Sequence, residues 1–444
     1  MRISIKEKEL FKNLIKKNFN LGISHVDSFC TDSRKIQKHD IFMPIKGHNV
    51  DSHKFIPDVI KKEASIIFSE TEFNNNSIIK VNSTKKTLKK ISSQWIKFFK
   101  APIIAITGSN GKTTTKEMLN QIFSYKYKTN YTIGNYNSSV GLPVNLFNFS
   151  LDADIIILEM GANKPNEIEY LCNIAQPDYS IITNIQNAHI GNFSSINELL
   201  DTKSSIFKNT SVNGLIFQNT DDTNISRVCK KFSNKKIKYG FNNKKVDFWG
   251  EIKIIHDKIH FYINNKRILN KKLNKFMAKN MLAAYSIAYT YGINHEIIIE
   301  AFKNFDFLDG RGNQIYKNGY LLINDTYNAN LESFKIGIES FMKIKCKGKK
   351  FLVIGDMKEL GSKNDEYHFE LGKYINIQKP TIVLGVGESI KITIDQINNN
   401  QIHCNHFTKN DKLINYLKKE LNRGDAIYIK ASRSMMFESI INKL

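Results

Sequence analysis

The chain has 444 residues, of which 41% are hydrophobic and 11% aromatic, and its formal net charge is +23. This length predicts about three domains of roughly 150 residues, and the apolar content excludes a disordered chain. No apolar run approaches the roughly 18 residues of a membrane span, and the N-terminal segment lacks a signal-peptide core. The five cysteines form no CxxC pair, which argues against a disulfide framework or a cysteine zinc site and favours a cytoplasmic protein without membrane insertion.

The positive charge has two interpretations. A basic chain can be a nucleic-acid binder, which a steep salt dependence of binding would reveal. Here the excess is lysine spread along the whole chain, often beside asparagine and isoleucine, rather than arginine and aromatics gathered on one element. We therefore expect a solvated basic surface that attracts polyanionic substrates, and no nucleic-acid partner.

Apolar periodicity predicts an α/β protein. Residues 1–18 predict an amphipathic helix with Leu10, Phe11, Leu14 and Ile15 on its apolar face. Buried strands are expected at residues 103–106, 155–158, 179–183, 214–218, 321–324, 351–354, 381–384 and 426–429. Helical stretches alternate with these strands, which favours parallel sheets. Ligands of such sheets bind beyond the carboxyl ends of the strands, where polar residues follow several of these runs.

Residues 103–115, IIAITGSNGKTTT, predict a strand, a glycine loop and the start of a helix. The loop and the helix N-terminus form an anion site in that context. Lys112 would reach the β- and γ-phosphates of a nucleotide, and the Thr113 hydroxyl would bind Mg²⁺. The alternative is an ordinary turn with a surface lysine. The spacing differs from GxxxxGK[ST], since Ile106 stands where that motif requires glycine.

Three further residues are candidates for metal chemistry. Glu159 ends an apolar strand, and Mg²⁺ prefers one or two carboxylates together with phosphate oxygens. His189 follows a strand beside Gly191, and Lys203 lies in a helical stretch. Each has a simpler interpretation as a solvated loop glutamate, a surface histidine or a solvated helix lysine.

Polar segments after other strands are candidate binding residues. Residues 134–143, GNYNSSVGLP, form a loop that is a candidate for nucleotide or peptide contact. Asp325 would either bind a ribose hydroxyl or form an Asx turn. Lys430 and Arg433 would pair with a carboxylate or a phosphate.

Together these segments resemble the Mur ligase family over nearly the whole chain. The resemblance lies in TGSNGKTTT, TDSRKIQKHDIFMPIKG, GNYNSSVGLP, EMGANKPNEI, DTYNANLESF, GDMKELG and YIKASRSM. It implies an α/β fold with three domains: a small N-terminal UDP-muramoyl-peptide domain (1–98), a central parallel-sheet ATP-binding domain (99–308) and a C-terminal Rossmann-like ligase domain (309–444). Folylpolyglutamate synthases share the glycine loop, but the N-terminal motif belongs to ligases that bind UDP-sugars. A regulatory NTPase is disfavoured because the chain has no NKxD motif.

The resemblance also implies an activity. A ligase of this kind uses ATP to phosphorylate the terminal carboxylate of UDP-N-acetylmuramoyl-tripeptide, and D-alanyl-D-alanine then attacks the acyl phosphate. ADP and phosphate are released in a step of peptidoglycan precursor synthesis. The enzyme is expected to be a monomer with ATP and two Mg²⁺ ions as cofactors.

Matching positions carry the family's roles. The catalytic residues implied are Lys112, Glu159, His189 and Lys203. Nucleotide contacts are implied for Gly108, Ser109, Asn110, Gly111, Lys112, Thr113, Thr114, Asn280, Arg311, Asp325, Asn328 and Asn330. Metal ligands are implied at Thr113 and Glu159 for one ion, and at His189 and a carbamylated Lys203 for the other. Substrate contacts are expected at Ser33, Arg34, Lys46, Gly47, Asn135 and Asn137.

Overall fold

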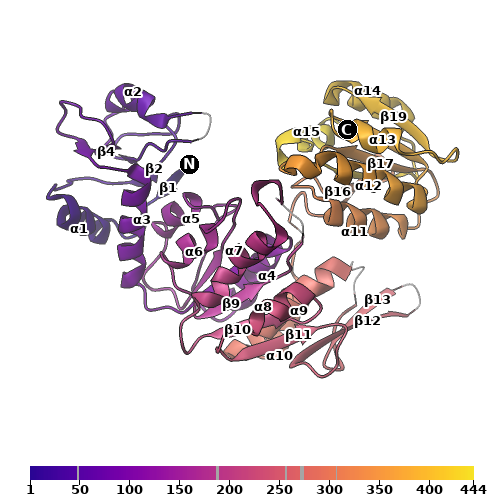
Figure 1. Ribbon diagram of the computed structural model, residues 1–444, viewed down its shortest axis with the longest axis horizontal. Helices are drawn as coiled ribbons and strands as arrows, with labels where there is room; N and C mark the ends of the chain where they lie inside the picture. The colour runs from indigo at the N-terminus through magenta and orange to yellow at the C-terminus, as the bar shows by residue number, and fades with distance from the viewer. Residues whose placement is uncertain (48–49, 187–189, 256–257, 271–274, 307) are drawn as a thin grey trace. The chain divides into compact units, whose positions relative to one another are not determined.

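The computed structural model describes residues 1–47, 50–186, 190–255, 258–270, 275–306 and 308–444. Within these ranges the strands form three sheets (Figure 1). The chain divides into two compact units, the first made of Met1–Asn184, Leu200–Lys271 and Ala278–Lys303, and the second of Ile185–Leu199, Lys272–Met277 and Asn304–Leu444. The predicted α/β class is confirmed, whereas the predicted boundaries after residues 98 and 308 stay predictions.

The first sheet belongs to the first unit and has the order β1-β2-β3-β4-β5. β1 and β2 are antiparallel, and the other pairs are parallel. Its strands are β1 (Arg2–Ser4), β2 (Ser28–Cys30), β3 (Ile41–Phe42), β4 (Ile66–Ser69) and β5 (Ile78–Lys80), and its helices are α1 (Lys8–Phe19), α2 (Ile56–Ile60) and α3 (Thr84–Trp95). The N-terminal helix is confirmed from Lys8 onward as α1, which buries Phe11, Leu14 and Ile15 and leaves Leu10 half-buried. The prediction was wrong for Arg2–Ser4, which form β1 instead.

An aromatic cluster joins α1 and α3 to the segment that follows α5 (Gly141–Leu146). The Phe11 ring lies 4.9 Å from the Phe147 ring in an edge-to-face arrangement. The fully buried Trp95 donates its indole N–H to the Leu146 carbonyl over 2.8 Å. The first two sheets therefore share apolar packing within one unit.

The second sheet also belongs to the first unit, in the order β14-β13-β12-β11-β10-β9-β6-β8-β7. It is parallel from β7 through β12 and antiparallel across β12-β13-β14. Its strands are β6 (Ile103–Thr107), β7 (Thr129–Tyr131), β8 (Ile155–Glu159), β9 (Tyr179–Ile182), β10 (Leu215–Asn219), β11 (Lys236–Gly240), β12 (Phe248–Ile255), β13 (Lys258–Ile263) and β14 (Lys266–Asn270). The further helices of this central region are α4 (Lys112–Ser124), α6 (Glu167–Cys172), α7 (Ile196–Lys208), α8 (Thr223–Cys229), α9 (Lys275–Tyr291) and α10 (His295–Lys303).

The expected strands at 103–106, 155–158, 179–183 and 214–218 are confirmed as β6, β8, β9 and β10. Sequence patterning did not predict β7 or β11 to β14. These strands mix polar and apolar residues, so they lack the continuous apolar run that marks a strand buried on both faces.

The third sheet lies in the second unit and has the order β15-β16-β20-β17-β18-β19. Its strands are β15 (Asn313–Lys317), β16 (Tyr320–Asn324), β17 (Lys350–Gly355), β18 (Ile382–Val386), β19 (His403–Phe407) and β20 (Ala426–Lys430). Its helices are α11 (Leu331–Met342), α12 (Asn364–Gln378), α13 (Ile390–Asp395), α14 (Asn410–Glu420) and α15 (Glu438–Lys443). α11, α12 and α13 pack on one face of the sheet, and α14 and α15 pack on the other (Figure 1). All four strands expected in this region are confirmed.

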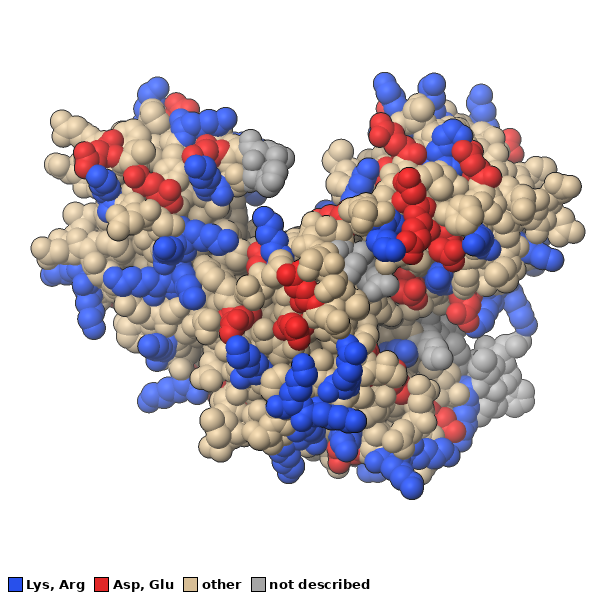
Figure 2. All heavy atoms as spheres, viewed as in Figure 1, with Lys and Arg blue, Asp and Glu red and all other residues tan. Residues whose placement is uncertain are grey.

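Charge is distributed over the molecule. On the face drawn in Figure 2, lysine and arginine side chains are scattered rather than gathered on one element, with carboxylates and uncharged residues between them. This distribution is the one expected for a solvated basic surface. Among the described residues, no helix combines the length and the apolar character needed to cross a bilayer.

Candidate active site

A glycine loop joins β6 to α4 and forms the predicted phosphate site. Gly108 and Gly111 adopt φ angles of 147° and 83°, which favour glycine. A Cβ atom at Gly111 would lie 2.4 Å from Oδ1 of Asn280 on α9, so a larger residue would displace that side chain. α4 begins directly after this loop. The first N–H groups of an α-helix point away from the helix, and such N-termini bind anions.

The end of β9 holds this loop in place. The Ser109 N–H donates to the Asn184 carbonyl over 2.9 Å, and the Asn110 N–H donates to Asn184 Oδ1 over 3.0 Å. The Thr183 hydroxyl donates to the Asn110 carbonyl over 2.6 Å. Sequence reasoning did not assign these two residues a role, although their place at the carboxyl end of a neighbouring strand was a usable signal.

Lys112 begins α4 and folds back over the loop. Its ammonium donates to the carbonyls of Gly108 (2.7 Å) and Ser109 (3.2 Å). Thr113 and Thr114 follow in the first helical turn and are largely buried. A cation and two hydroxyl-bearing residues therefore lie beside the anion site at the N-terminus of α4.

Glu159 ends β8 and is 1% exposed. Its Oε1 accepts a hydrogen bond from Asn137 Nδ2 over 2.6 Å. Its buried Oε2 has no hydrogen-bond partner among the described residues. A buried carboxylate oxygen without a donor is costly, and a bound cation would remove that cost. The donor set therefore fits Mg²⁺, which needs only one or two carboxylates when phosphate oxygens complete its shell.

Lys203 lies on α7, and its Nζ donates to the Gly108 carbonyl over 3.3 Å. Burial, with a further contribution from the positive charge of Lys112, lowers the pKa of Lys203 to about 7. An amine that loses its proton near neutral pH is able to react with CO₂, so this environment fits a carbamate.

Two observations limit the metal site. His189 lies outside the described residues. Among the residues that the structure describes, no group of three or more His, Cys, Asp or Glu side chains is arranged to hold a metal ion.

Asn280 contacts the same loop from α9. The residue is 4% exposed, and its buried Nδ2 has no hydrogen-bond acceptor among the described residues. An unsatisfied buried donor fits an acceptor on a bound nucleotide. That contact stays a prediction.

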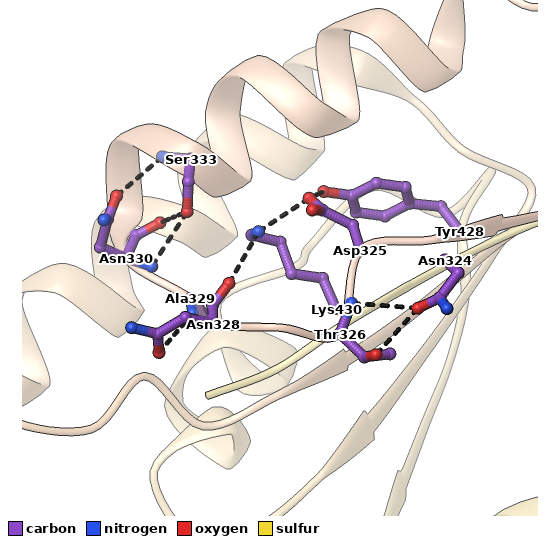
Figure 3. Close-up of polar contacts among 9 residues, drawn as sticks. All are labelled: Asn324, Asp325, Thr326, Asn328, Ala329, Asn330, Ser333, Tyr428 and Lys430. Carbon is purple, nitrogen blue, oxygen red and sulfur yellow. Dashed lines mark hydrogen bonds and ion pairs between the residues drawn. The ribbon is translucent and has the colours of Figure 1, made fainter. Parts of the chain in front are cut away.

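In the second unit, Asp325 lies directly after β16 and is tied to β20 (Figure 3). Its Oδ2 accepts hydrogen bonds from the Tyr428 hydroxyl (2.6 Å) and the Lys430 ammonium (2.7 Å). Lys430 also donates to the Asn328 carbonyl over 2.9 Å. The carboxylate therefore fixes the segment after β16 to the neighbouring strand, and its contact with a ribose remains a prediction.

The neighbouring asparagines also have roles within the fold (Figure 3). Asn328 Oδ1 accepts from the Ala329 N–H over 2.9 Å. Asn330 caps α11, because its Oδ1 accepts from the Ser333 N–H (2.9 Å) while its own N–H donates to the Ser333 hydroxyl (3.0 Å). Elsewhere in this unit, the Arg311 guanidinium lies 3.8 Å from the centre of the Tyr327 ring.

The predicted substrate residues all belong to the first unit. Ser33, Arg34, Lys46 and Gly47 lie in the region of the first sheet, and Asn135 and Asn137 lie between β7 and α5. Arg34 donates through Nε and Nη2 to the two carboxylate oxygens of Asp32, each over 2.9 Å, and this pairing lowers the pKa of Asp32 to about 2. The Ser33 carbonyl accepts from Lys62 (2.9 Å). The backbones of Lys46 and Asp51 form an isolated antiparallel β-bridge.

The remaining predicted substrate residues lie in two loops. The Gly47 N–H donates to the Val50 carbonyl over 2.9 Å. Asn135 is exposed, whereas Asn137 lies beside Glu159. The loop expected at residues 134–143 ends at residue 140, because Gly141 begins α5. Through Asn137 this loop contacts the Glu159 carboxylate.

Three family models match the chain: the Mur ligase middle domain at residues 106–288, the Mur ligase glutamate ligase domain at 310–433, and the Mur ligase family catalytic domain at 25–124. A UDP-N-acetylmuramoyl-tripeptide–D-alanyl-D-alanine ligase of Buchnera aphidicola subsp. Baizongia pistaciae is 32% identical over 431 residues. That match covers 94% of this chain and 92% of the relative. The chain belongs to the Mur ligase family.

Other Mur ligases agree with this membership. A Bacillus subtilis ligase of the same name is 28% identical, over 94% of this chain and 93% of its own. The MurF ligase of Thermotoga maritima, solved in complex with ADP, is 27% identical with a TM-score of 0.81, over 94% of this chain and 96% of its own. The resemblance inferred from the motifs is therefore confirmed along nearly the whole length.

Proposed function

We propose that this Mur ligase uses ATP to join D-alanyl-D-alanine to UDP-N-acetylmuramoyl-tripeptide, with release of ADP and phosphate, in peptidoglycan precursor synthesis. Relatives of that name match over 94% of the chain, and the Thermotoga relative binds ADP. The geometric observation that carries the proposal is Glu159, buried after β8. One of its carboxylate oxygens is hydrogen-bonded, and the other has no partner within the described part of the chain.

The residues around the glycine loop supply the positioning and the charge that phosphoryl transfer requires. The N-terminus of α4 and the Lys112 ammonium bind the phosphates and stabilise the charge that develops on the transferring group. Thr113 and Glu159 would hold one Mg²⁺, and His189 with a carbamylated Lys203 would hold a second. When bound, Mg²⁺ neutralises charge on the phosphate oxygens. The substrate carboxylate takes the phosphoryl group, and the amine of D-alanyl-D-alanine displaces phosphate from the acyl phosphate.

Each of the three parts of the chain would then bind a different substrate. Residues 1–98 bind the UDP-muramoyl-peptide through Ser33, Arg34, Lys46 and Gly47, together with Asn135 and Asn137 of the central part. Residues 99–308 bind ATP, with Asn280 on the base. Residues 309–444 present Arg311, Asp325, Asn328 and Asn330 to the nucleotide and bind the incoming dipeptide. The protein acts as a monomer in the cytoplasm, where its five free cysteines remain reduced.

A phosphate-release assay tests this function. The mixture contains ATP, Mg²⁺, UDP-N-acetylmuramoyl-tripeptide and D-alanyl-D-alanine, and each component is omitted in turn. We expect release only with all four present, and a product whose mass has increased by the dipeptide less one water. Release without the dipeptide would indicate a regulatory NTPase, and turnover with folate and glutamate would indicate a folylpolyglutamate-type ligase.

A further inference from the structure

Lys116 is a lysine inside the protein, on the helix that begins at the phosphate loop. It lies one helical turn after Lys112 on α4 and has no exposed surface. Its Nζ lies 2.6 Å from the Thr132 carbonyl, 3.2 Å from the Gly134 carbonyl and 2.6 Å from Glu117 Oε1. An ammonium has three donors, and three oxygens surround this one. A buried charge satisfied in this way is an organised feature of the fold.

The two carbonyls belong to the segment that leaves β7. Asn145, fully buried on α5, holds the same segment from another side. Its Oδ1 accepts from the Ile133 N–H over 3.1 Å, and its Nδ2 donates to the Tyr131 carbonyl over 3.4 Å. Lys116 and Asn145 therefore fix four consecutive residues, 131–134.

This segment is joined to Glu159 at two points. The Thr132 hydroxyl accepts from the Glu159 N–H over 3.0 Å. Three residues beyond Gly134, Asn137 donates to Glu159 Oε1, and the Asn137 carbonyl accepts from the Gly161 N–H over 2.8 Å. The position of residues 131–137 therefore decides which oxygen of Glu159 is hydrogen-bonded and which is left for a ligand.

We propose that Lys116 is a positioning residue for the ligase reaction, acting through the 131–137 segment and Asn137 to orient Glu159 toward the phosphate site. This inference rests on the proposed function, in which Glu159 binds Mg²⁺. Lys116 has no exposed surface, and its ammonium is surrounded by oxygens of the protein, so its effect on the site is indirect. The ammonium joins the helix that carries the phosphate-binding lysine to the segment that orients the carboxylate, so the two groups keep a constant separation.

The test compares Lys116→Met with Asn137→Ala and their double mutant. Methionine keeps most of the side-chain volume, and replacing a buried charge with an apolar group of similar size often preserves folding. Leu119→Ala is the matched control, because Leu119 is fully buried on the same helix and its side chain has no polar atom. The readouts are the affinity for ADP measured with Mg²⁺ and with EDTA, the kcat of ligation and the melting temperature.

We expect Lys116→Met to reduce the Mg²⁺-dependent part of ADP affinity by about 10-fold to 100-fold, as for other groups that orient a metal ligand, and to leave the affinity in EDTA unchanged. Asn137→Ala should behave alike, and the double mutant should be no worse than the weaker-binding single mutant, since both act on one carboxylate. Leu119→Ala should lower the melting temperature without changing the Mg²⁺-dependent part.

Two results would overturn the inference: an unchanged Mg²⁺ response in Lys116→Met, or effects that multiply in the double mutant. If Lys116→Met does not fold, Asn145→Ala gives an independent test, because Asn145 also holds residues 131 and 133. An unchanged Mg²⁺ response in Asn145→Ala would count equally against the inference. A wild-type protein that binds Mg²⁺-ADP but does not ligate D-alanyl-D-alanine would refute the proposed function, while the ADP measurements would still decide the role of Lys116.

Discussion

The Lys430 ammonium lies 2.7 Å from the Asp325 carboxylate, although 105 positions separate the two residues in the chain. The Lys430 side chain is 3% exposed and that of Asp325 is 20% exposed. The two residues lie close together because the sheet order places β20 directly beside β16. The pair therefore joins the DTYNAN segment to the KASR segment at the carboxyl ends of two adjacent interior strands of the third sheet.

Lys430→Met should destabilise the second unit, because it leaves the largely buried Asp325 carboxylate with Tyr428 as its remaining side-chain donor. Removing one partner of a buried pair costs about 3 kcal/mol. Urea denaturation followed by circular dichroism measures the change. The double mutant with Asp325→Asn should recover part of the loss, and a Lys430→Met protein as stable as the wild type would contradict the ion pair.

Gly337→Ala should lower the free energy of unfolding, although alanine normally favours a helix more than glycine does. A Cβ atom there would lie 1.9 Å from the Tyr428 hydroxyl, which donates to Asp325. Overpacking of this kind costs about 1–3 kcal/mol. Glu339→Ala, at an exposed position of the same helix, is the control and should change the free energy of unfolding by no more than about 0.5 kcal/mol.

Lys112→Ala should reduce kcat by about 10²–10³-fold, by analogy with the loss of one donor to a transition-state oxyanion. Folding should be intact, since the ammonium donates to two carbonyls of the loop that immediately precedes it. The comparison is Lys126→Ala, an exposed lysine just beyond α4. A folded Lys112→Ala enzyme with near-normal turnover would rule out the phosphate role.

Lys203 provides a test of the carbamate. Lys203→Ala should lose most activity, and acetate should restore part of it by supplying an oxygen anion in the vacated space. Lys203→Arg should remain inactive because it keeps a positive charge beside the metal. Lys208→Ala, exposed on the same helix, is the control. Near-full activity of the arginine variant would defeat the carbamate and leave the ligase assignment intact.

The buried Lys203 amine also predicts a pH dependence of stability. Its pKa falls from 10.5 to about 7 in the folded protein, so between these values the unfolded state binds a proton that the folded state lacks. The free energy of unfolding should therefore rise with pH across this window. In CO₂-free buffer without metal, the wild type should gain stability relative to Lys203→Met from about pH 7 upward. Parallel profiles of the two proteins would contradict the lowered pKa.

Local patterning was sufficient for the buried parallel strands and for the phosphate loop. Continuous apolar runs mark strands covered on both faces, and β6, β8 and β9 were predicted for that reason. The glycines of TGSNGKTTT indicate positions where the backbone needs a positive φ angle, and Gly108 and Gly111 do adopt positive φ angles. Buried strands and a glycine loop each depend on a few neighbouring residues, so a single sequence is enough to predict them.

The partners of each polar side chain were decided only by the tertiary structure. Asp325 was expected either to bind a ribose or to form a local turn, and it pairs with Lys430 because β20 inserts between β16 and β17. Lys116 lies in a helix rich in polar residues, where a lysine is normally solvated. In the structure, carbonyl oxygens of the segment that follows β7 accept hydrogen bonds from its ammonium. Such contacts depend on strand order and helix packing across the whole domain, which the periodicity of a local segment does not encode.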